Sequence, residues 1–233
     1  MIERWMNCPI GPAQEGYPYQ VPAECGQSLV DITDMDRVYY DATYARMGLK
    51  NTLRRCYVRQ QVAKMLQQVL ELLPPEYSLW IYDTLRPKEV QQSLYDMYWQ
   101  QLAQDHPDAT EEELKVLIDD FVAYPRIDYE RPTPHSTGGA VDLTLMKNGQ
   151  LLPMGTEFDD LTDKANTRYF EDAVTEEEKV FRDNRRLLYQ VMIQVGFVNY
   201  RNEWWHFAYG DRAWGRATGK TPIYSYISLE KNI

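Results

Sequence analysis

The segment from Gly139 to Met146 is the sequence feature that most limits how this chain can fold. Small, β-branched and apolar residues dominate it, with only Asp142 and Thr144 interrupting them, and such a run predicts a buried strand. The Asn148-Gly149 pair that follows favours a type I′ turn, so the chain is expected to return as a hairpin through residues 150–152. The middle of the chain therefore contains an antiparallel hairpin.

Helical patterns lie on both sides of this hairpin. Between Val58 and Leu73 the apolar residues recur with helical spacing, and Pro74-Pro75 ends them. Further helices are expected from Pro87, from near Thr110 with Glu113 in a capping box, and from Thr175 with Glu178 to just before Gly196. The short runs 78–83, 197–200 and 203–209 are expected to be strands.

Helices placed early and late around hairpins predict an α+β fold, with a central antiparallel sheet flanked by helices. The chain has 233 residues and 44% hydrophobic content, which suits a single domain with one core. Residues 1–30 contain several Pro and Gly residues and are expected to form an irregular N-terminal arm. The domain itself is then expected to span residues 31–233.

Charge and apolar content exclude several classes of partner. The formal net charge of -10 argues against nucleic acid, because phosphate binding needs a concentrated basic patch. No apolar run is long enough for a membrane span or a secretory leader, so we expect no membrane partner and a cytoplasmic location, or a periplasmic one if a leader precedes this chain. Three cysteines without a CxxC spacing argue against a disulfide framework or a cysteine zinc site. No feature of the sequence predicts an oligomeric state.

Two polar groups stand where the chain should be buried. His135 is followed by Ser-Thr-Gly-Gly and then by the strand that carries Asp142. An aspartate inside Ala-Val-Asp-Leu-Thr-Leu is unfavourable to bury unless it is paired or bound to a metal. The glycines allow a tight turn, so the loop histidine and the strand aspartate can converge.

A second pair lies in Glu203-Trp204-Trp205-His206-Phe207, where an acid and a histidine are packed among large aromatic side chains. His135, Asp142 and His206 form a nitrogen-and-oxygen set that leaves a fourth zinc position open for water. The remaining histidine, His106, lies in a polar stretch between helices and is expected to be a solvated loop residue. The three candidate ligands therefore predict a catalytic metal site.

The same ligands could also hold iron(II) in an oxygenase. In such sites the first two ligands are usually much closer in sequence, and an oxygenase has no need of an additional carboxylate. Glu203 supplies that carboxylate near a ligand, where it can take a proton from water and deliver it to a leaving amine. The combination favours hydrolysis.

At these residues the chain resembles the D-alanyl-D-alanine dipeptidases, the VanX-type branch of the zinc peptidases with the Hedgehog/DD-peptidase fold. The family signature is HxxGxAxD followed by ExWH, and this chain contains both, over a resemblance that spans roughly residues 30 to 210. The resemblance implies one zinc ion per chain held by His135, Asp142 and His206, with Glu203 as general base and acid. It also implies that Arg86, in Asp-Thr-Leu-Arg-Pro, stabilises the oxyanion.

The resemblance implies a substrate-binding set as well, because a free dipeptide is a zwitterion whose two ends need partners. Asp159 matches the acid that binds the amine, and Tyr44 matches a tyrosine near the same end. Thr133 stands where the family often has a serine that helps to hold the substrate. After Tyr44 the chain also departs from the usual Asn-Phe-x-Gly stretch, so the pocket wall is expected to differ.

Three functions remain open from the sequence. The first is a dipeptidase that cleaves D-alanyl-D-alanine or a close relative. The second is a DD- or LD-carboxypeptidase that acts on longer peptidoglycan peptides. The third is a non-catalytic wall-peptide binding module with a structural zinc ion, although such a module needs neither Glu203 nor Arg86.

Overall fold

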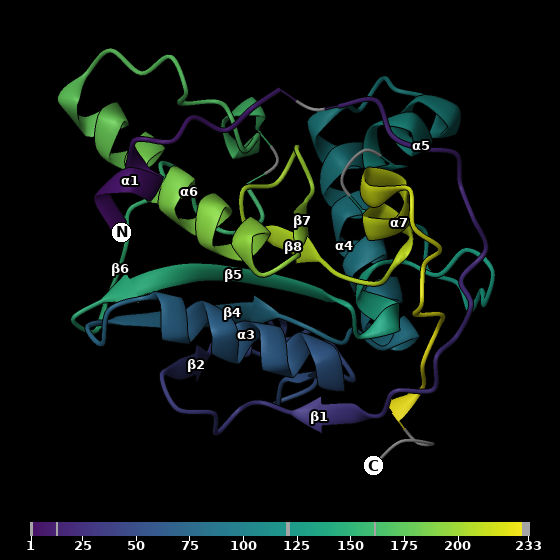
Figure 1. The fold of residues 1–233 in the computed structure, drawn as a ribbon. Helices are drawn as coiled ribbons and strands as arrows, with labels where there is room; N and C mark the ends of the chain where they lie inside the picture. Colours follow the sequence, from purple (N-terminus) through teal and green to yellow (C-terminus); the bar gives the residue numbers. More distant parts are fainter. Residues whose placement is uncertain (1, 13, 120–121, 161, 230–233) are drawn as a thin grey trace.

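The computed structural model describes residues 2–12, 14–119, 122–160 and 162–229, and a mixed sheet runs through its centre (Figure 1). The predicted strand is β5 (Ala140–Lys147), which pairs with β4 (Tyr77–Asp83) on one side and with β8 (His206–Ala208) on the other. The order across the sheet is β2 (Val38–Tyr40), β4, β5, β8 and β7 (Val198–Asn199), and β6 (Gln150–Leu151) also pairs with β5. The hairpin prediction is confirmed, since Asn148 and Gly149 both have positive φ.

One part of the sheet differs from the prediction of a wholly antiparallel arrangement. Strand β2 runs parallel to β4, because α2 (Thr43–Arg46), β3 (Tyr57–Arg59) and α3 (Gln60–Leu72) intervene and bring the chain back to the same end. Strand β3 pairs with β1 (Leu29–Asp31) in a separate antiparallel pair. The α+β class is correct, but the sheet is mixed.

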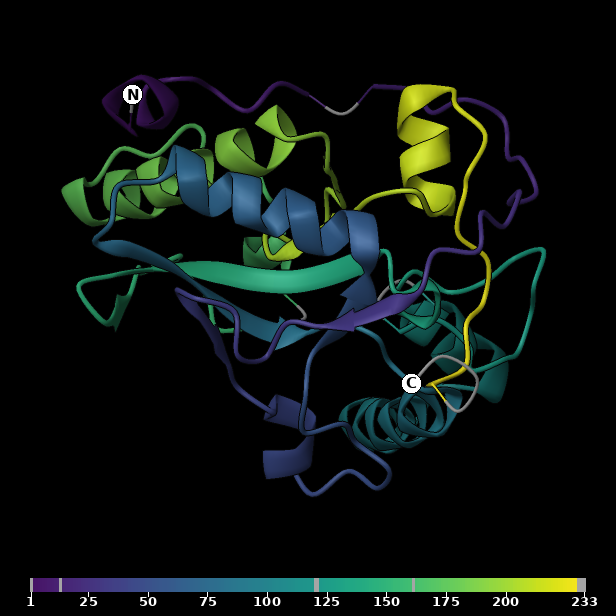
Figure 2. The ribbon, with the colours of Figure 1, turned by 60° about the horizontal axis from the view of Figure 1, so that its bottom comes forward.

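The helix predictions are confirmed, with α3 ending before Pro74-Pro75 and α4 (Lys88–Asp105) following Pro87. Both predicted capping boxes are present at the starts of α5 (Glu111–Asp119) and α6 (Glu176–Gln194). Figure 2 shows α3 and α6 together on one side of β5 and α4 on the other. The main core joins α3 and α6 to alternate residues of β4 and β5, among them Leu79, Ile81, Val141, Leu143 and Leu145.

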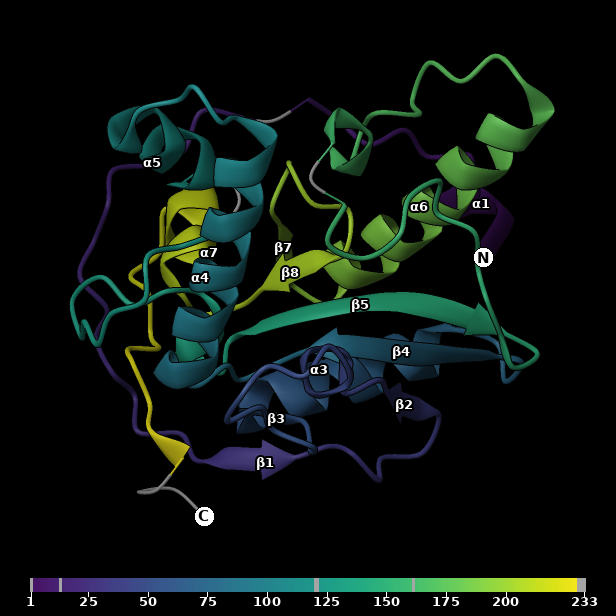
Figure 3. The same cartoon turned by 180° about the vertical axis from the view of Figure 1, so that it is seen from behind.

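A smaller apolar cluster joins α4 and α5 on the opposite side of the sheet. Seen from behind, α4 and α5 gather with α7 (Arg212–Thr218) near the beginning of β5 (Figure 3). Since successive strand residues point to opposite faces, the β5 side chains that do not enter the main core face this second layer. Asp142 is one of them.

The N-terminal arm differs at its two ends from the prediction of an irregular segment over residues 1–30. Residues Ile2–Met6 form α1, which packs on α6 and buries Trp5 in the main core, and Leu29 already belongs to β1. The Pro and Gly residues that suggested an arm all lie after α1. Residues between Asn7 and Ser28 contain no helix or strand in their described part, so the prediction was wrong only at those ends; the domain division itself stays a prediction.

Cys8, Cys25 and Cys56 are free thiols, in agreement with the expectation of no disulfide framework. In the described part of the chain, none of the helices combines the length and the apolar character that crossing a bilayer requires.

Arg185 of α6 holds the segment 152–167 against the core. Its side chain is 1% exposed, and it donates hydrogen bonds to the carbonyls of Met154 (2.7 Å), Lys164 (2.9 Å) and Asn166 (2.8 Å). The guanidinium also lies over the ring of Phe170, 4.7 Å from its centroid. One buried cation therefore satisfies backbone groups at both ends of the segment that carries Asp159.

Replacing this cation is expected to destabilise the fold. Arg185→Met keeps much of the volume but leaves three carbonyls without their donor, which should lower the free energy of unfolding by about 2–4 kcal/mol. Urea denaturation followed by circular dichroism measures this change. Arg182→Met, on the more exposed part of the same helix, is the control and should change stability by less than about 0.5 kcal/mol. Equal stability of the two variants would contradict the role of Arg185.

Candidate active site

The register between β5 and β8 brings Asp142 and His206 together. They are direct cross-strand partners, so their side chains leave the same face of the sheet. The nitrogen His206 Nδ1 lies 2.9 Å from Asp142 Oδ1. Both side chains are buried, at 6% exposure for His206 and 2% for Asp142. Asp142 and His206, which are 64 positions apart in sequence, thus meet at the centre of the site.

His135 reaches the same point from the short 3-10 turn η1 (His135–Thr137) that precedes β5. The turn closes through Gly138, whose φ is +71°, and Gly139, where a Cβ would lie 2.5 Å from the Tyr209 carbonyl oxygen. The Nδ1 atom of His135 lies 2.7 Å from the carbonyl oxygen of Thr84. Because a carbonyl only accepts, Nδ1 carries the proton and the lone pair of Nε2 faces Asp142 and His206.

The three side chains fit the demands of a tetrahedral metal ion. One donor atom from each of His135, Asp142 and His206 can be chosen so that all three lie within 4.8 Å of one another. The Nε2 atom of His135 is 3.2 Å from His206 Nδ1 and 3.2 Å from Asp142 Oδ2. Ligands about 2.0 Å from a tetrahedral zinc ion are separated by about 3.3 Å, which is close to these distances. The sequence prediction that these residues converge is therefore supported by their geometry.

The charges within this group stabilise one another. Burial by itself would raise the pKa of Asp142. The combined effect of His135 and His206 is larger, and it holds the pKa of Asp142 below its usual range. For His135, burial lowers the pKa, but the Asp142 carboxylate outweighs burial and the net shift is upward. A buried carboxylate with this low affinity for protons is well suited to remain an anionic metal ligand.

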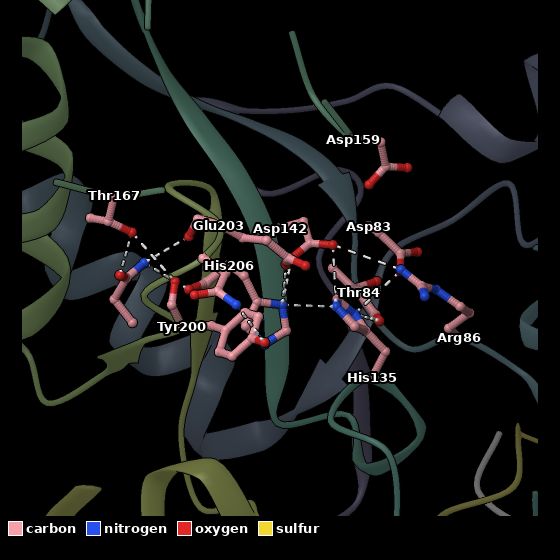
Figure 4. Close-up of polar contacts among 12 residues, drawn as sticks. Asp83, Thr84, Arg86, His135, Asp142, Asp159, Thr167, Tyr200, Glu203 and His206 are labelled. Atoms are coloured by element: carbon pink, nitrogen blue, oxygen red, sulfur yellow. Dashed lines mark hydrogen bonds and ion pairs between the residues drawn. The ribbon is translucent and has the colours of Figure 1, made fainter. Parts of the chain in front are cut away.

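Glu203 lies beside the three candidate ligands, in the turn that leads into β8. Its Oε2 atom is 3.7 Å from His206 Nδ1, and Figure 4 shows the two residues side by side. The Glu203 side chain is 22% exposed and lines the pocket. Burial raises the pKa of the Glu203 carboxyl to about 8, while His206 acts in the opposite direction. A carboxyl with a pKa near neutrality can both accept and release a proton at ordinary pH.

Arg86 is fixed beside the candidate ligands by three directional hydrogen bonds. Its Nε donates to Asp83 Oδ2 (2.8 Å), Nη1 to Gln91 Oε1 (2.9 Å) and Nη2 to the Tyr44 hydroxyl (3.0 Å). The same Nη2 lies 3.8 Å from Asp142 Oδ2. The guanidinium is therefore a pre-positioned cation at the edge of the metal group.

Tyr44 connects this cation to Asp159. The Tyr44 hydroxyl accepts from Arg86 and donates to Asp159 Oδ2 at 3.0 Å. Burial raises the pKa of Asp159 to about 7, although Arg86 opposes this shift. Tyr44 and Asp159 line the same cavity of about 260 Å³ as the candidate ligands, Glu203, Arg86 and Thr133. The residues predicted for substrate binding are thus brought together, whereas His106 is exposed at the end of α4, as expected.

The elevated pKa of Asp159 predicts a pH-dependent effect on stability. Its carboxyl stays protonated in the folded protein until the pH reaches about 7, so ionisation destabilises the fold progressively between pH 4 and 7. Asp159→Asn removes this ionisation, and asparagine tolerates the φ of 60° at this position. We expect the metal-free variant to melt a few degrees above the wild type at pH 8, since about 1 kcal/mol corresponds to roughly 2–4 °C. The two proteins should melt alike near pH 4, and a lower melting temperature of the variant at pH 8 would refute the assignment.

Two positioning residues were not predicted from the sequence. Asp83 accepts from Arg86 and lies 3.2 Å from His135 Nδ1, because a bulge after Ile81 places it opposite Asp142. Asn199 donates to the carbonyls of Glu203 (3.1 Å) and His206 (3.0 Å), which fixes the turn between them. Asp83 could have been suspected, as an acid that ends an apolar strand three residues before Arg86. Asn199 carries no comparable signal.

Comparisons with known proteins agree with this geometry. A family model described as D-ala-D-ala dipeptidase, of the peptidase M15 group, matches residues 33–224. A D-alanyl-D-alanine dipeptidase of Synechocystis sp. is 30% identical over 210 residues, which cover 82% of this chain and 85% of the relative. A protein of the same name from Enterococcus faecium is 28% identical over 166 residues, with coverages of 70% and 78%. One from Escherichia coli is 32% identical over 130 residues, with coverages of 55% and 53%. The matched range includes all the residues of the candidate site.

Proposed function

We propose, from the premise that this chain belongs to the D-ala-D-ala dipeptidase family of peptidases, that it hydrolyses D-alanyl-D-alanine or a closely similar D-amino-acid dipeptide with the help of zinc. The observation that carries the proposal is the buried group of His135, Asp142 and His206, with Glu203 and Arg86 beside it. Two imidazoles and one carboxylate are one of the donor sets found in catalytic zinc sites.

The three ligands would hold the ion, which when bound polarises the scissile carbonyl and a water molecule. Glu203 takes a proton from the attacking water and then transfers it to the leaving amine. The Arg86 guanidinium stabilises the negative charge that develops on the carbonyl oxygen. Since three neighbours already orient Arg86, little reorganisation is needed when this charge appears.

The two ends of the pocket differ in the chemistry that they offer to a dipeptide. Asp159 and the Tyr44 hydroxyl provide acceptors for the substrate ammonium group. Thr133, two positions before the proposed ligand His135, offers a hydroxyl on the wall of the same cavity. A carboxylate with a pKa near 7 gains a favourable partner when a free amine binds, so Asp159 favours dipeptides over longer chains.

Amino-acid release from a panel of dipeptides tests this function. The zinc-loaded protein should release alanine from D-Ala-D-Ala, much less from L-Ala-L-Ala, and none after a chelator is added. N-acetyl-D-Ala-D-Ala should be a far poorer substrate, because it has no ammonium group for Asp159. Equal rates with free and acetylated substrates would instead favour a carboxypeptidase that acts on longer peptidoglycan peptides. No hydrolysis by protein with confirmed zinc would refute the enzyme proposal and leave the binding module.

A further inference from the structure

A second pocket borders the catalytic one and has the opposite charge. It has a volume of about 600 Å³, and we call it the basic pocket because its wall carries Lys115, Arg126, Arg131 and Arg212. Asp119, Ala123, Thr133 and Pro134 line both pockets. The two cavities therefore share part of their walls. Such a concentration of cations stands out in a chain whose net charge is -10.

The cations of the basic pocket are only partly neutralised. Lys115 pairs with Asp119 at 3.0 Å, and Arg126 lies 3.4 Å from Asp128. Within the described residues, Arg131 and Arg212 have no ion pair, and Arg212 Nε has no hydrogen-bond partner. Burial lowers the pKa of Arg212, and the nearby Arg126 and Arg131 lower it further by repulsion. An anion in this pocket would relieve that repulsion.

The N-terminal arm holds two of these cations in place. The guanidinium groups of Arg131 and Arg212 both lie over the ring of Tyr19, at 5.7 Å and 4.5 Å from its centroid. The Tyr19 hydroxyl also donates to the Glu130 carbonyl. Stacking on one ring restricts both guanidinium groups and reduces the entropy lost when they bind a ligand.

The catalytic pocket has little to offer to a carboxylate. Among the described residues that line it, Arg86 is the only Lys or Arg, and its three polar nitrogens already have partners. If the proposed function is correct, the substrate brings a terminal carboxylate to a pocket whose one arginine is already engaged. Guanidinium groups in the neighbouring basic pocket can supply the charged donors that this carboxylate needs.

We propose that the basic pocket is an anion subsite beside the Thr133–Pro134 wall of the catalytic pocket, and that it takes a carboxylate or phosphate group through Arg131 and Arg212. The proposal that the anion is the terminal carboxylate of the substrate rests on the proposed function. Arg131 and His135 are four positions apart, so their Cα atoms are separated by at most about 14 Å. The side chain of arginine can span much of that distance. Alternatively, the anion is a free carboxylate or phosphate from solution, which would bind whether or not a dipeptide is present.

Kinetics with a dipeptide and its amide test whether the bound anion is the carboxylate of the substrate. We would measure kcat and KM for D-Ala-D-Ala and for D-alanyl-D-alaninamide, whose terminus is neutral, with the wild type, Arg131→Gln and Arg212→Gln. Each variant should lose about tenfold in kcat/KM for the acid, mainly through KM, because a removed cation weakens binding of the carboxylate. The amide should be much less affected, so the preference for acid over amide falls.

The matched control is Arg54→Gln, an exposed arginine that lines neither pocket. Its preference for acid over amide should equal that of the wild type. Arg131 is itself exposed, so its variant provides the test even if Arg212→Gln fails to fold.

Calorimetric titration with inorganic phosphate tests the subsite independently of turnover. The zinc-loaded wild type should bind phosphate several-fold more tightly than either variant. The three proteins have the same proposed metal ligands, so the difference in affinity reports on the basic pocket. Weaker phosphate binding with an unchanged acid-to-amide preference supports the subsite and assigns it to a free anion. If the wild type hydrolyses no dipeptide, the proposed function fails while the phosphate titration still decides on the subsite. Unchanged phosphate affinity and unchanged preference in both variants would overturn the proposal.

Discussion

Glu203→Gln is expected to reduce kcat by about 10²–10⁴-fold while the protein keeps its metal. Glutamine has nearly the same shape, but its amide cannot take a proton from water and return it to the leaving amine. The proposed ligands are His135, Asp142 and His206, so the substitution removes none of them. Alanine release under saturating D-Ala-D-Ala, together with metal analysis of the purified variant, measures both quantities.

The control for this experiment is Glu157→Gln, an exposed acid on the same segment as Asp159. It should retain kcat within about twofold, as expected for a surface substitution. Normal turnover by the Glu203 variant would show that another group moves the proton. Loss of metal in that variant would show instead that Glu203 is a ligand, contrary to the proposed mechanism.

Arg86→Lys is expected to lower kcat/KM by about 10²–10³-fold, mainly through kcat. The variant keeps a positive charge, but an ammonium group cannot reproduce the planar geometry that contacts Asp83, Gln91 and Tyr44 together. Stabilisation of the transition state is therefore lost more than binding of the ground state. Steady-state kinetics with D-Ala-D-Ala separates the two effects.

Arg55→Lys is the matched control, since Arg55 is half-exposed and its ion pairs among the described residues are with Asp31 and Asp34 at the surface. We expect it to leave both kinetic constants unchanged. If Arg86→Lys changes KM alone, Arg86 would be a binding residue with no special role in the transition state.

Much of the local structure could be predicted from the sequence. Periodicity located α3, cap residues located the start of α6, and Asn148-Gly149 located the hairpin, because each signal acts over a few residues. The parallel direction of β2 could not be predicted from a local signal of this kind, because it depends on where the chain returns to the sheet after α3. Helix α1 was missed because five residues carry too little pattern, and its stability comes from packing on α6.

The sequence by itself determined which residues could make a metal site. Asp142 and His206 are polar groups inside apolar strands, and burial of such groups is unfavourable unless they find partners, so residue type and position alone indicated their chemistry. The family resemblance added the roles of Arg86 and Asp159. These predictions needed residue types and spacing, both of which are properties of the chain.

Only the tertiary structure decided how these groups are oriented and what supports them. The bulge that turns Asp83 toward His135, the Asn199 bonds to the Glu203 turn, and the basic pocket beside the catalytic one all depend on contacts between distant segments. Arg131 and Arg212 lie 81 positions apart, yet they stack on the same ring of Tyr19. No local sequence pattern encodes these long-range contacts, because electrostatic and packing energies depend on distances in space. Those distances are set when the whole sheet and its helices assemble.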